Sequence, residues 1–371
     1  MNLFSNSDFI NCKNFISNKK FDKVFIITGQ NSFYKSGADK LLKKIVDMKK
    51  TYLFFKKKML PDIIELNYLI KELKKFKPDL IIALGGGCVL DYAKIANVFH
   101  NEENIEKKVK KLKFLFKNKL STLIAIPTTA GSGAEVTPFA VLYINNIKYS
   151  VEHRLVKPDY FFIAPQLILS SKKPLKASSG FDAIAQALES LISFKSNKKS
   201  IQFSKQSLKF SIQNYKNFIH KPNNDNTFKM SLAANLSGKA IAIAKTNAPH
   251  ALSYPFSTHY GISHGHAVSL TINQFMILSY LNSEKSIAPF DLKKRFHEIF
   301  KTLKVKNIYE FDLLLKNLKK DGSLEGEYHK LGINISRDYG KIMSSVNAQR
   351  LSNFPIKMNK KDIKSILLMD L

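Results

Sequence analysis

An apolar run that passes straight into three glycines constrains the fold of this chain more than any other feature. Residues Asp79 to Leu84 are typical of a buried strand, and Gly85-Gly86-Gly87 follows without an intervening residue. The segment from Val89 to Phe99 then continues with helical spacing. Near-continuous apolar strands that alternate with helices are typical of parallel sheets. The pattern therefore predicts a strand, a glycine turn and a helix of a doubly wound α/β domain.

Strand and helix patterns alternate through the first part of the chain and then give way to helical patterns alone. The predicted strands span residues 24–28, 51–55, 79–84, 120–127 and 157–163, and the predicted helices among them span 37–45, 63–76 and 89–99. Helical spacing continues at 182–194, 200–219, 228–245 and 265–281, and lysine-rich amphipathic segments follow at 287–303 and 309–318. We therefore predict an α/β domain over residues 1–165 and a helical domain over residues 166–371.

Four side chains between Gly180 and Ala267 are candidates for binding a divalent metal. Asp182 and Gln186 are four residues apart, so on a helix they face the same way. His250 and His264 would add two imidazole nitrogens. A mixed carboxylate and imidazole site suits iron(II), zinc, manganese or nickel better than calcium or magnesium. Taken singly, such an aspartate is more often a cap or surface charge, and such a histidine a hydrogen-bonded core residue.

The glycine turn and a second loop of small residues predict a nucleotide site. Glycines let the backbone approach a pyrophosphate, and the first amides of the following helix point at the anion. Taken alone, Gly85-Gly86-Gly87 is equally compatible with tight packing. A second loop, Pro127 to Thr137, also follows a strand and is rich in hydroxyl groups. Both loops can border the same crevice at the carboxyl ends of the strands.

Composition indicates a globular protein of two domains. The chain has 371 residues, of which 44% are hydrophobic and 24% charged. Residues Met1 to Lys20 lack the apolar core of a signal peptide, and no later run is long enough to span a bilayer, so we expect a cytoplasmic protein without membrane contact. The two cysteines, Cys12 and Cys88, cannot build a disulfide framework.

The net charge of +30 does not by itself indicate a nucleic-acid partner. Only four of the 59 basic residues are arginines, and the lysines are scattered along the whole chain. Proteins that read a DNA sequence rely on arginine for bidentate base contacts. We therefore favour a compositional bias and expect no nucleic-acid partner. A role of the lysines in attracting anionic substrates stays open.

The two loops together resemble the iron-containing alcohol dehydrogenase family, from about Val24 to about Tyr280. The family reads Gly-Gly-Gly-Ser-x-x-Asp-x-Ala-Lys, and residues 85–94 reproduce it with Cys88 in the serine position. It also reads Pro-Thr-Thr-Ala-Gly-Thr-Gly-Ser-Glu-Val-Thr, which residues 127–137 follow closely. The resemblance implies a dehydroquinate synthase-like fold, with an NAD(P)-binding α/β domain and an all-α domain that binds metal and carries the catalytic groups.

The resemblance also implies residue roles. The family's metal ligands are matched by Asp182, His250 and His264, whereas Gln186 replaces a histidine; the metal expected is Fe²⁺ or another divalent ion such as Zn²⁺. Tyr254 stands where the family usually has a histidine, and its ordinary pKa near 10 makes it a poorer proton shuttle. The protonating group is Tyr254, His266 or water. The positions expected to contact NADPH or NADH are Gly29, Gly86, Gly87, Cys88, Asp91, Thr128, Thr129, Ser132 and Lys148.

Three features resemble one branch of the family, the phosphonoacetaldehyde reductases, which make 2-hydroxyethylphosphonate. These features are Gln186 and the segments 148–153 and 245–255. A phosphonate dianion requires cationic partners, and Lys245, Arg154 and His153 are the candidates. In so lysine-rich a chain, Lys245 is equally well explained as a solvated side chain. In the implied reaction the metal acts as a Lewis acid on the aldehyde and the nicotinamide supplies the hydride.

Cofactor choice depends on Gly29, which occupies the place of an aspartate found in NAD-preferring members of the family. Without that carboxylate a 2′-phosphate is not repelled, so we expect NADP(H) to be accepted. A general alcohol or lactaldehyde dehydrogenase and a degenerate nucleotide-binding protein without turnover are the alternative functions. A sugar-phosphate cyclase of related fold fits the motifs less well. A homodimer is compatible with the resemblance and has no other support.

Overall fold

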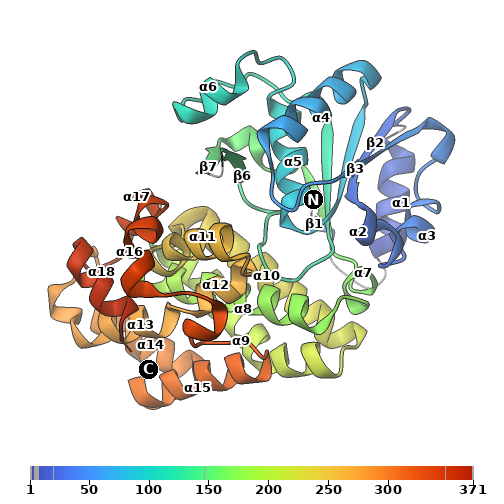
Figure 1. Cartoon of the computed structure of the whole chain (residues 1–371). Helices are drawn as coiled ribbons and strands as arrows, with labels where there is room; N and C mark the ends of the chain where they lie inside the picture. Colours follow the sequence, from blue (N-terminus) through green and yellow to red (C-terminus); the bar gives the residue numbers. More distant parts are fainter. Residues whose placement is uncertain (1, 4–7, 20, 146, 347, 370–371) are drawn as a thin grey trace. The chain divides into compact units, whose positions relative to one another are not determined.

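The computed structural model of the chain describes residues 2–3, 8–19, 21–145, 147–346 and 348–369, and it divides into two compact units (Figure 1). The first unit comprises the residues up to Thr129 together with Gly133–Ser171 and Asn223–Ser231. The second comprises Ala130–Ser132, Lys172–Pro222 and Leu232–Leu371.

A parallel six-stranded sheet forms the centre of the first unit, in the order β1-β8-β5-β4-β2-β3. Its strands are β1 (Asn2–Leu3), β2 (Val24–Gly29), β3 (Thr51–Lys56), β4 (Leu80–Gly85), β5 (Thr122–Pro127) and β8 (Tyr160–Phe162). Successive side chains of a strand face opposite sides of a sheet. Accordingly, Phe25 and Ile27 belong to one apolar cluster and Val24 and Ile26 to another. The sheet is therefore buried on both faces, as its apolar strands predict.

Helices cover the sheet of the first unit, and a separate hairpin accompanies it. The helical elements are α1 (Asp8–Asn18), α2 (Gln30–Tyr34), α3 (Ala38–Leu42), η1 (Met48–Lys50), α4 (Ile63–Phe76), α5 (Gly87–Val98), α6 (Ile105–Lys110), η2 (Arg154–Val156) and α7 (Gln166–Leu169). The antiparallel hairpin consists of β6 (Phe139–Ile144) and β7 (Ile147–Glu152). Lys94 of α5 ties the loop before this hairpin in place, because its ammonium donates to the carbonyls of Ala134 and Phe139 at 2.9 and 2.6 Å.

The regular elements of the second unit are all helices among its described residues. Its elements are α8 (Lys173–Ile192), α9 (Lys198–His220), α10 (Asn224–Ala244), α11 (Ala248–Tyr260), α12 (His264–Ser269), α13 (Ile272–Leu281), η3 (Ser283–Lys285), α14 (Leu292–Leu303), α15 (Ile308–Asp321), η4 (His329–Leu331), α16 (Ile335–Ser344), α17 (Ala348–Leu351) and α18 (Lys360–Leu367). The first turns of α10 are grouped with the first unit. Helix α8 is buried on every side from Gly180 to Ile192, so the polar side chains in that stretch require internal partners.

The predicted fold class is confirmed, and two details of the helical part are corrected. Residues 265–281 do not form one helix, because α12 ends at Ser269 and α13 begins at Ile272. Helix α11 was not predicted; it contains Pro249 in its first turn and Pro255 in its interior, which weakens a helical pattern. The domain boundary at residues 165 and 166 stays a prediction. Within the described ranges, no helix is both long and apolar enough to cross a bilayer.

Candidate functional site

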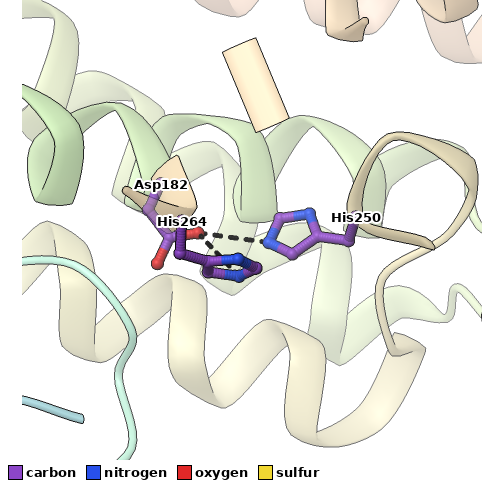
Figure 2. Close-up of side chains that lie close together, drawn as sticks. All are labelled: Asp182, His250 and His264. Atoms are coloured by element: carbon purple, nitrogen blue, oxygen red, sulfur yellow. Dashed lines mark hydrogen bonds and ion pairs between the residues drawn. The ribbon is translucent and has the colours of Figure 1, made fainter. Parts of the chain in front are cut away.

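Three predicted metal ligands converge in the second unit (Figure 2). Asp182 comes from α8, His250 from α11 and His264 from the first residue of α12. Their ligand atoms all lie within 4.8 Å of one another. The Nε2 atoms of His250 and His264 lie 3.1 and 3.9 Å from the same Oδ1 atom of Asp182. One carboxylate and two imidazoles directed at one point fit a zinc or iron(II) ion, whose bonds to such ligands are about 2.0–2.2 Å long.

Access to this trio is from the side of His264. The side chain of His264 is 39% exposed, whereas those of His250 and Asp182 are 4% and 6% exposed. A small molecule would therefore approach past the imidazole of His264. A catalytic metal site keeps one position open for water or substrate. Three protein ligands with one accessible side fit that requirement.

A close approach of α12 to α8 brings His264 to Asp182. A Cβ atom on Gly265 would lie 1.9 Å from the carbonyl oxygen of Ser178 and 2.9 Å from the Cβ of Asp182. Only glycine permits that distance between the two helices. Upstream, α11 ends in the left-handed residue Gly261, which turns the chain toward the start of α12. The site therefore requires glycine at position 265 for a steric reason.

Substitution of Gly265 by alanine is expected to damage fold and site together. The added methyl group would force α12 away from α8, at a cost of about 1–3 kcal/mol or more in the free energy of unfolding. Metal binding should weaken as well, because His264 moves with α12. Thermal unfolding and metal content measure the two effects. Gly340→Ala is the matched control, since a Cβ there meets no atom within 4 Å and should leave both unchanged or raise stability slightly. Wild-type behaviour of G265A would contradict the steric account.

In both metal-facing histidines the second ring nitrogen, Nδ1, contacts a polar side chain. Nδ1 of His250 interacts with the Oε2 of Glu189, a carboxylate that is fully buried. Oε1 of Glu189 accepts from the backbone N–H groups of Asn247 and His250 at 2.9 and 3.3 Å. Nδ1 of His264 lies 3.3 Å from the hydroxyl of Ser253. Such partners fix the tautomer of a metal-binding histidine and direct Nε2 at the metal.

Glu189 was not predicted to be part of the site. It lies seven residues after Asp182 on the same buried helix, so the helical period alone places both on one face. The signal was therefore present in the sequence. Its partner His250 lies on another helix, and only the packing of α11 against α8 turns a buried carboxylate into the support of a ligand.

Gln186 faces Asp182 with its amide nitrogen. Nε2 donates to Oδ2 of Asp182 at 3.1 Å, as expected for residues one helical turn apart, while the amide oxygen accepts from the hydroxyl of Ser237 at 2.9 Å. In this arrangement Gln186 orients Asp182. Metal ligation through its oxygen would require the amide to turn over, so that role stays a prediction.

The charges of the trio depend on one another. Burial would lower the pKa of His250, but the carboxylates of Glu189 and Asp182 raise it to about 9. Burial would likewise raise the pKa of Asp182, but its hydrogen bond with His250 and the charge of His264 hold it below the ordinary value. The metal-free protein therefore keeps a proton on His250 at neutral pH that a metal must displace.

Metal affinity is accordingly expected to rise with pH. A metal binds neutral imidazole, so below pH 9 the His250 proton competes with it, and one displaced proton changes the apparent affinity about tenfold per pH unit. Competition of the protein with a chromophoric chelator for zinc, measured between pH 6 and 8.5, tests this slope. An affinity that does not change over this range would show that the proton is absent from the metal-free site.

Of the two predicted proton donors, Tyr254 is the better placed. Its buried ring stacks on His264, with 5.8 Å between centroids and 15° between planes. Burial raises the pKa of Tyr254, with the nearby Arg350 opposing this, so the phenol keeps its proton at neutral pH. The Nε2 atom of His266 instead lies 2.8 Å from the carbonyl oxygen of Glu325, which engages that nitrogen in a structural bond.

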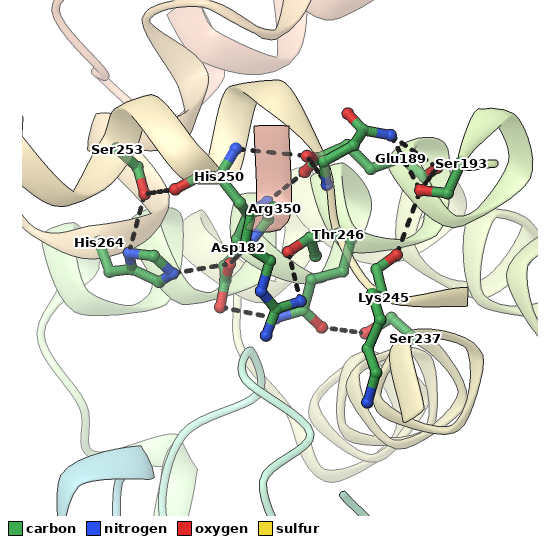
Figure 3. A network of polar contacts seen from close by, with 12 residues as sticks. Asp182, Glu189, Ser193, Ser237, Lys245, Thr246, His250, Ser253, His264 and Arg350 are labelled. Carbon is green, nitrogen blue, oxygen red and sulfur yellow. Dashed lines mark hydrogen bonds and ion pairs between the residues drawn. The ribbon is translucent and has the colours of Figure 1, made fainter. Parts of the chain in front are cut away.

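Arg350, from the C-terminal part of the chain, belongs to the polar network around the trio (Figure 3). Nη1 of Arg350, in α17, donates to the hydroxyl of Thr246 at 2.9 Å. Asn353 fastens this part of the chain, because its Nδ2 donates to the carbonyls of Ala244 and Thr246 at 2.8 and 3.0 Å. Between them, Lys245 adopts a left-handed backbone with φ of 61°. Arg350 was not predicted, since no motif links it to residues so much earlier in the chain.

In the first unit, the predicted nucleotide-binding residues gather at the carboxyl ends of neighbouring strands. Gly29 ends β2, Gly86 caps α5 after β4, and the backbone N–H of Thr128 after β5 donates to the carbonyl of Gly85 at 3.0 Å. A Cβ on Gly86 would lie 3.5 Å from the side chain of Thr129. The glycine turn and the threonine loop therefore meet at one sheet edge, where nucleotides bind in such folds.

Other predicted cofactor contacts differ in their setting. Burial raises the pKa of the Cys88 thiol to about 12, which makes it a small neutral side chain in place of serine. Burial also raises the pKa of Asp91 to about 6, although Lys94 and Lys148 oppose this. Ser132 belongs to the second unit, where its carbonyl oxygen lies 3.5 Å from Nε2 of Gln186. The cofactor roles of these residues stay predictions.

Two of the predicted substrate residues lie in the first unit. His153 follows β7 and caps η2, since its Nδ1 accepts from the backbone N–H of Leu155 at 3.2 Å, and its ring packs on Phe116. Arg154 is the next residue and begins η2. Lys245 belongs to the second unit together with the metal trio. Contact of any of the three with a substrate stays a prediction.

Comparison with known proteins decides the family. Residues 2–165 match the sequence profile described as iron-containing alcohol dehydrogenase, and residues 176–370 match the C-terminal profile of the Fe-containing alcohol dehydrogenase family. The chain belongs to the iron-containing alcohol dehydrogenase family. Two relatives illustrate the range within it. The phosphonoacetaldehyde reductase of Streptomyces viridochromogenes is 30% identical over 218 residues, and the aldehyde-alcohol dehydrogenase of Streptococcus pneumoniae is 29% identical over 217.

These matches cover parts of both partners. They span 56% and 55% of this chain, about half (55%) of the reductase and a quarter (25%) of the aldehyde-alcohol dehydrogenase. The crystal structure of sulfoacetaldehyde reductase from Bifidobacterium kashiwanohense, in complex with NAD⁺, has the same fold. It covers 99% of this chain and 96% of its own at a TM-score of 0.88, with 21% identity. Membership of the family is consistent with the Asp182, His250 and His264 trio.

Proposed function

We propose that this chain reduces a small aldehyde to its primary alcohol with NADPH or NADH, supported by a divalent metal. The observation that carries the proposal is the convergence of Asp182 and the Nε2 atoms of His250 and His264 on one point (Figure 2). Fe²⁺ is the metal expected from the family, and Zn²⁺ suits the same ligands. When bound there, such a metal supplies Lewis acidity toward a carbonyl oxygen.

The residues of the chain then have distinct tasks in the proposed reaction. A hydride passes from the nicotinamide to the carbonyl carbon, and a proton reaches the carbonyl oxygen, which gives the alcohol and the oxidised nucleotide. Tyr254 is the proposed proton donor, because it is protonated at neutral pH and lies against His264. Glu189 and Ser253 hold the two imidazoles, and Gln186 holds the carboxylate of Asp182.

Phosphonoacetaldehyde is the proposed substrate, and 2-hydroxyethylphosphonate the product. Two observations favour an anionic aldehyde. One is the 30% identity to a phosphonoacetaldehyde reductase. The other is Arg350, whose guanidinium is near enough to Tyr254 to oppose the rise in its pKa, and Tyr254 in turn stacks on His264. A guanidinium binds phosphonate oxygens in a bidentate way, which an ammonium cannot match.

Oxidation of NADPH by the iron(II)-loaded protein, followed by absorbance, tests this proposal. Phosphonoacetaldehyde, propionaldehyde and lactaldehyde are offered in parallel, with a chelator-treated sample as the control. The proposed function predicts kcat/KM about tenfold or more higher for the phosphonate, as expected from a charge-assisted contact. Comparable values with the neutral aldehydes would indicate a general alcohol or lactaldehyde dehydrogenase. No oxidation with any aldehyde would indicate a nucleotide-binding protein without turnover.

Replacement of Arg350 by glutamine should reduce the preference for the anionic aldehyde. We expect KM for phosphonoacetaldehyde to rise about 10-fold or more, because a charged hydrogen bond to the substrate is lost, and KM for propionaldehyde to stay within about twofold. Arg337→Gln is the matched control, since that arginine is exposed and paired with Asp338. An equal rise in KM for both substrates would show that Arg350 only supports Thr246 and that another residue binds the anionic group.

A further inference from the structure

The carboxyl ends of β2 and β3 form an open corner beside the glycine turn. Gly29 and Lys56 are paired across these two strands in the last register of the ladder. The backbone of Gly29 has φ of −101° and ψ of 146°, which any L-residue adopts. A Cβ on Gly29 would lie 3.6 Å from the hydroxyl oxygen of Ser32 and 3.8 Å from Cε of Lys56. The position therefore has room for a side chain, and a hydroxyl and a lysine border that space.

The ammonium of Lys56 lies between this corner and the first turn of α5. Its Nζ donates to the carbonyl of Lys58 at 2.7 Å. The same ammonium lowers the pKa of the Cys88 thiol against the larger effect of burial, which places it close to the glycine turn. Two carboxylates, Asp91 and Glu65, also act on that thiol, and the two oxygens of Glu65 accept from the backbone N–H groups of Lys57 and Lys58. A lysine ammonium has three N–H donors, so it can bind a further anion.

The sheet order relates this corner to one part of a dinucleotide. In a doubly wound sheet, the strand that carries the glycine turn holds the pyrophosphate, and the end of the adjacent strand holds the adenosine ribose. Here β4 carries the glycine turn and β2 is its neighbour. An acidic residue at the end of that neighbour binds the ribose 2′-hydroxyl and repels a 2′-phosphate. Gly29 removes the repulsion, and Lys56 introduces a positive charge at the same place.

We propose that Lys56 and Ser32 form the subsite for the 2′-phosphate of NADP(H). This inference rests on the proposed function, because it requires that the first unit bind a nicotinamide dinucleotide. The ammonium pairs with the phosphate dianion, and the hydroxyl donates a hydrogen bond to one of its oxygens. NADH lacks the phosphate and makes neither contact. The missing aspartate at Gly29 explains why a phosphate is tolerated, whereas Lys56 explains why it is preferred.

Calorimetric titration of the iron-loaded protein with NADPH and with NADH tests the subsite by binding alone. Lys56→Met removes the charge and keeps the length of the side chain. It should weaken NADPH about 10–100-fold, as loss of a charged hydrogen bond does, and leave NADH within about twofold. Lys56→Arg should retain NADPH binding. Lys57→Met is the matched control one residue further along, with an exposed side chain, and should change neither titration.

A second variant tests the same corner by adding a negative charge where Lys56→Met removes a positive one. Gly29→Asp places a carboxylate against Lys56 in a backbone conformation that tolerates it, so it should weaken NADPH at least tenfold and leave or improve NADH binding. Equal weakening of NADPH and NADH by Lys56→Met would assign the ammonium to the shared pyrophosphate and overturn the proposal. Unchanged NADPH binding by that variant would overturn it as well. A wild-type protein that binds neither nucleotide would instead overturn the proposed function itself.

Discussion

Asp182→Asn is expected to abolish metal binding and turnover while the fold is kept. Asp182 is the carboxylate on which both metal-facing nitrogens converge, and an amide is a weak neutral donor for zinc or iron(II). Loss of a Lewis acid removes several kcal/mol of transition-state stabilisation, which corresponds to about 10³-fold or more in kcat/KM. Metal content and NADPH oxidation are measured on the same sample.

The control for this variant is Asp225→Asn. Asp225 pairs on an exposed face of α10 with Lys229, at 2.7 Å, and should tolerate the change with wild-type metal content and activity. The asparagine can still hydrogen-bond its neighbours, so we expect the fold to be kept. The midpoint of thermal unfolding checks this and so separates loss of metal from loss of fold. Retention of most of the metal and most of the activity in Asp182→Asn would refute the assignment of this residue as a ligand.

Glu189→Gln is expected to weaken the metal site through a tautomer change. In the wild type, one oxygen of Glu189 accepts two backbone N–H groups and the other interacts with Nδ1 of His250. If the glutamine oxygen keeps the backbone bonds, its NH₂ group faces Nδ1 and donates to it. His250 must then carry its proton on Nε2, and that nitrogen loses the lone pair with which it would bind the metal. Metal affinity should fall about 10–100-fold, the range found for partners of metal-binding histidines.

Metal competition titrations on Glu189→Gln and on Ser193→Ala distinguish this effect from a general loss of packing. Ser193 accepts from the side chain of Asn247 at 2.9 Å but does not contact the imidazole of His250, so its loss should leave metal affinity within about threefold. Chemical shifts of the His250 ring nitrogens report the tautomer directly. A Glu189→Gln protein with wild-type affinity and an unchanged tautomer would show that the carboxylate only fills space.

Local periodicity allowed much of this fold and part of the site to be predicted. The apolar runs that predicted parallel strands form β2, β3, β4, β5 and β8. The four-residue spacing of Asp182 and Gln186 predicted a shared helix face, and their side chains are 3.1 Å apart. Likewise, the two loops expected at one sheet edge meet through the bond from Thr128 to Gly85. Each of these inferences depends on backbone geometry over a few residues, which sequence records directly.

Features that depend on packing between distant segments were not predictable in the same way. Arg350 reaches Thr246 from a short helix near the C-terminus, and no local pattern connects the two. The corner of Gly29 and Lys56 depends on the strand order, which places β2 between β3 and β4. Helix α11 escaped prediction because Pro255 in its interior is unfavourable locally, although the buried face of the helix compensates in the folded unit. In each case tertiary contacts outweigh the local signal.

Asp182, His250 and His264 are together expected to hold the metal. Anomalous diffraction at the iron edge, from crystals of the iron(II)-loaded protein, tests it most directly. We expect one stoichiometric peak about 2.0–2.2 Å from the Asp182 carboxylate and from Nε2 of both histidines. An iron peak at another place in the protein, or stoichiometric iron without a peak at this trio, would show that these three residues do not hold the metal.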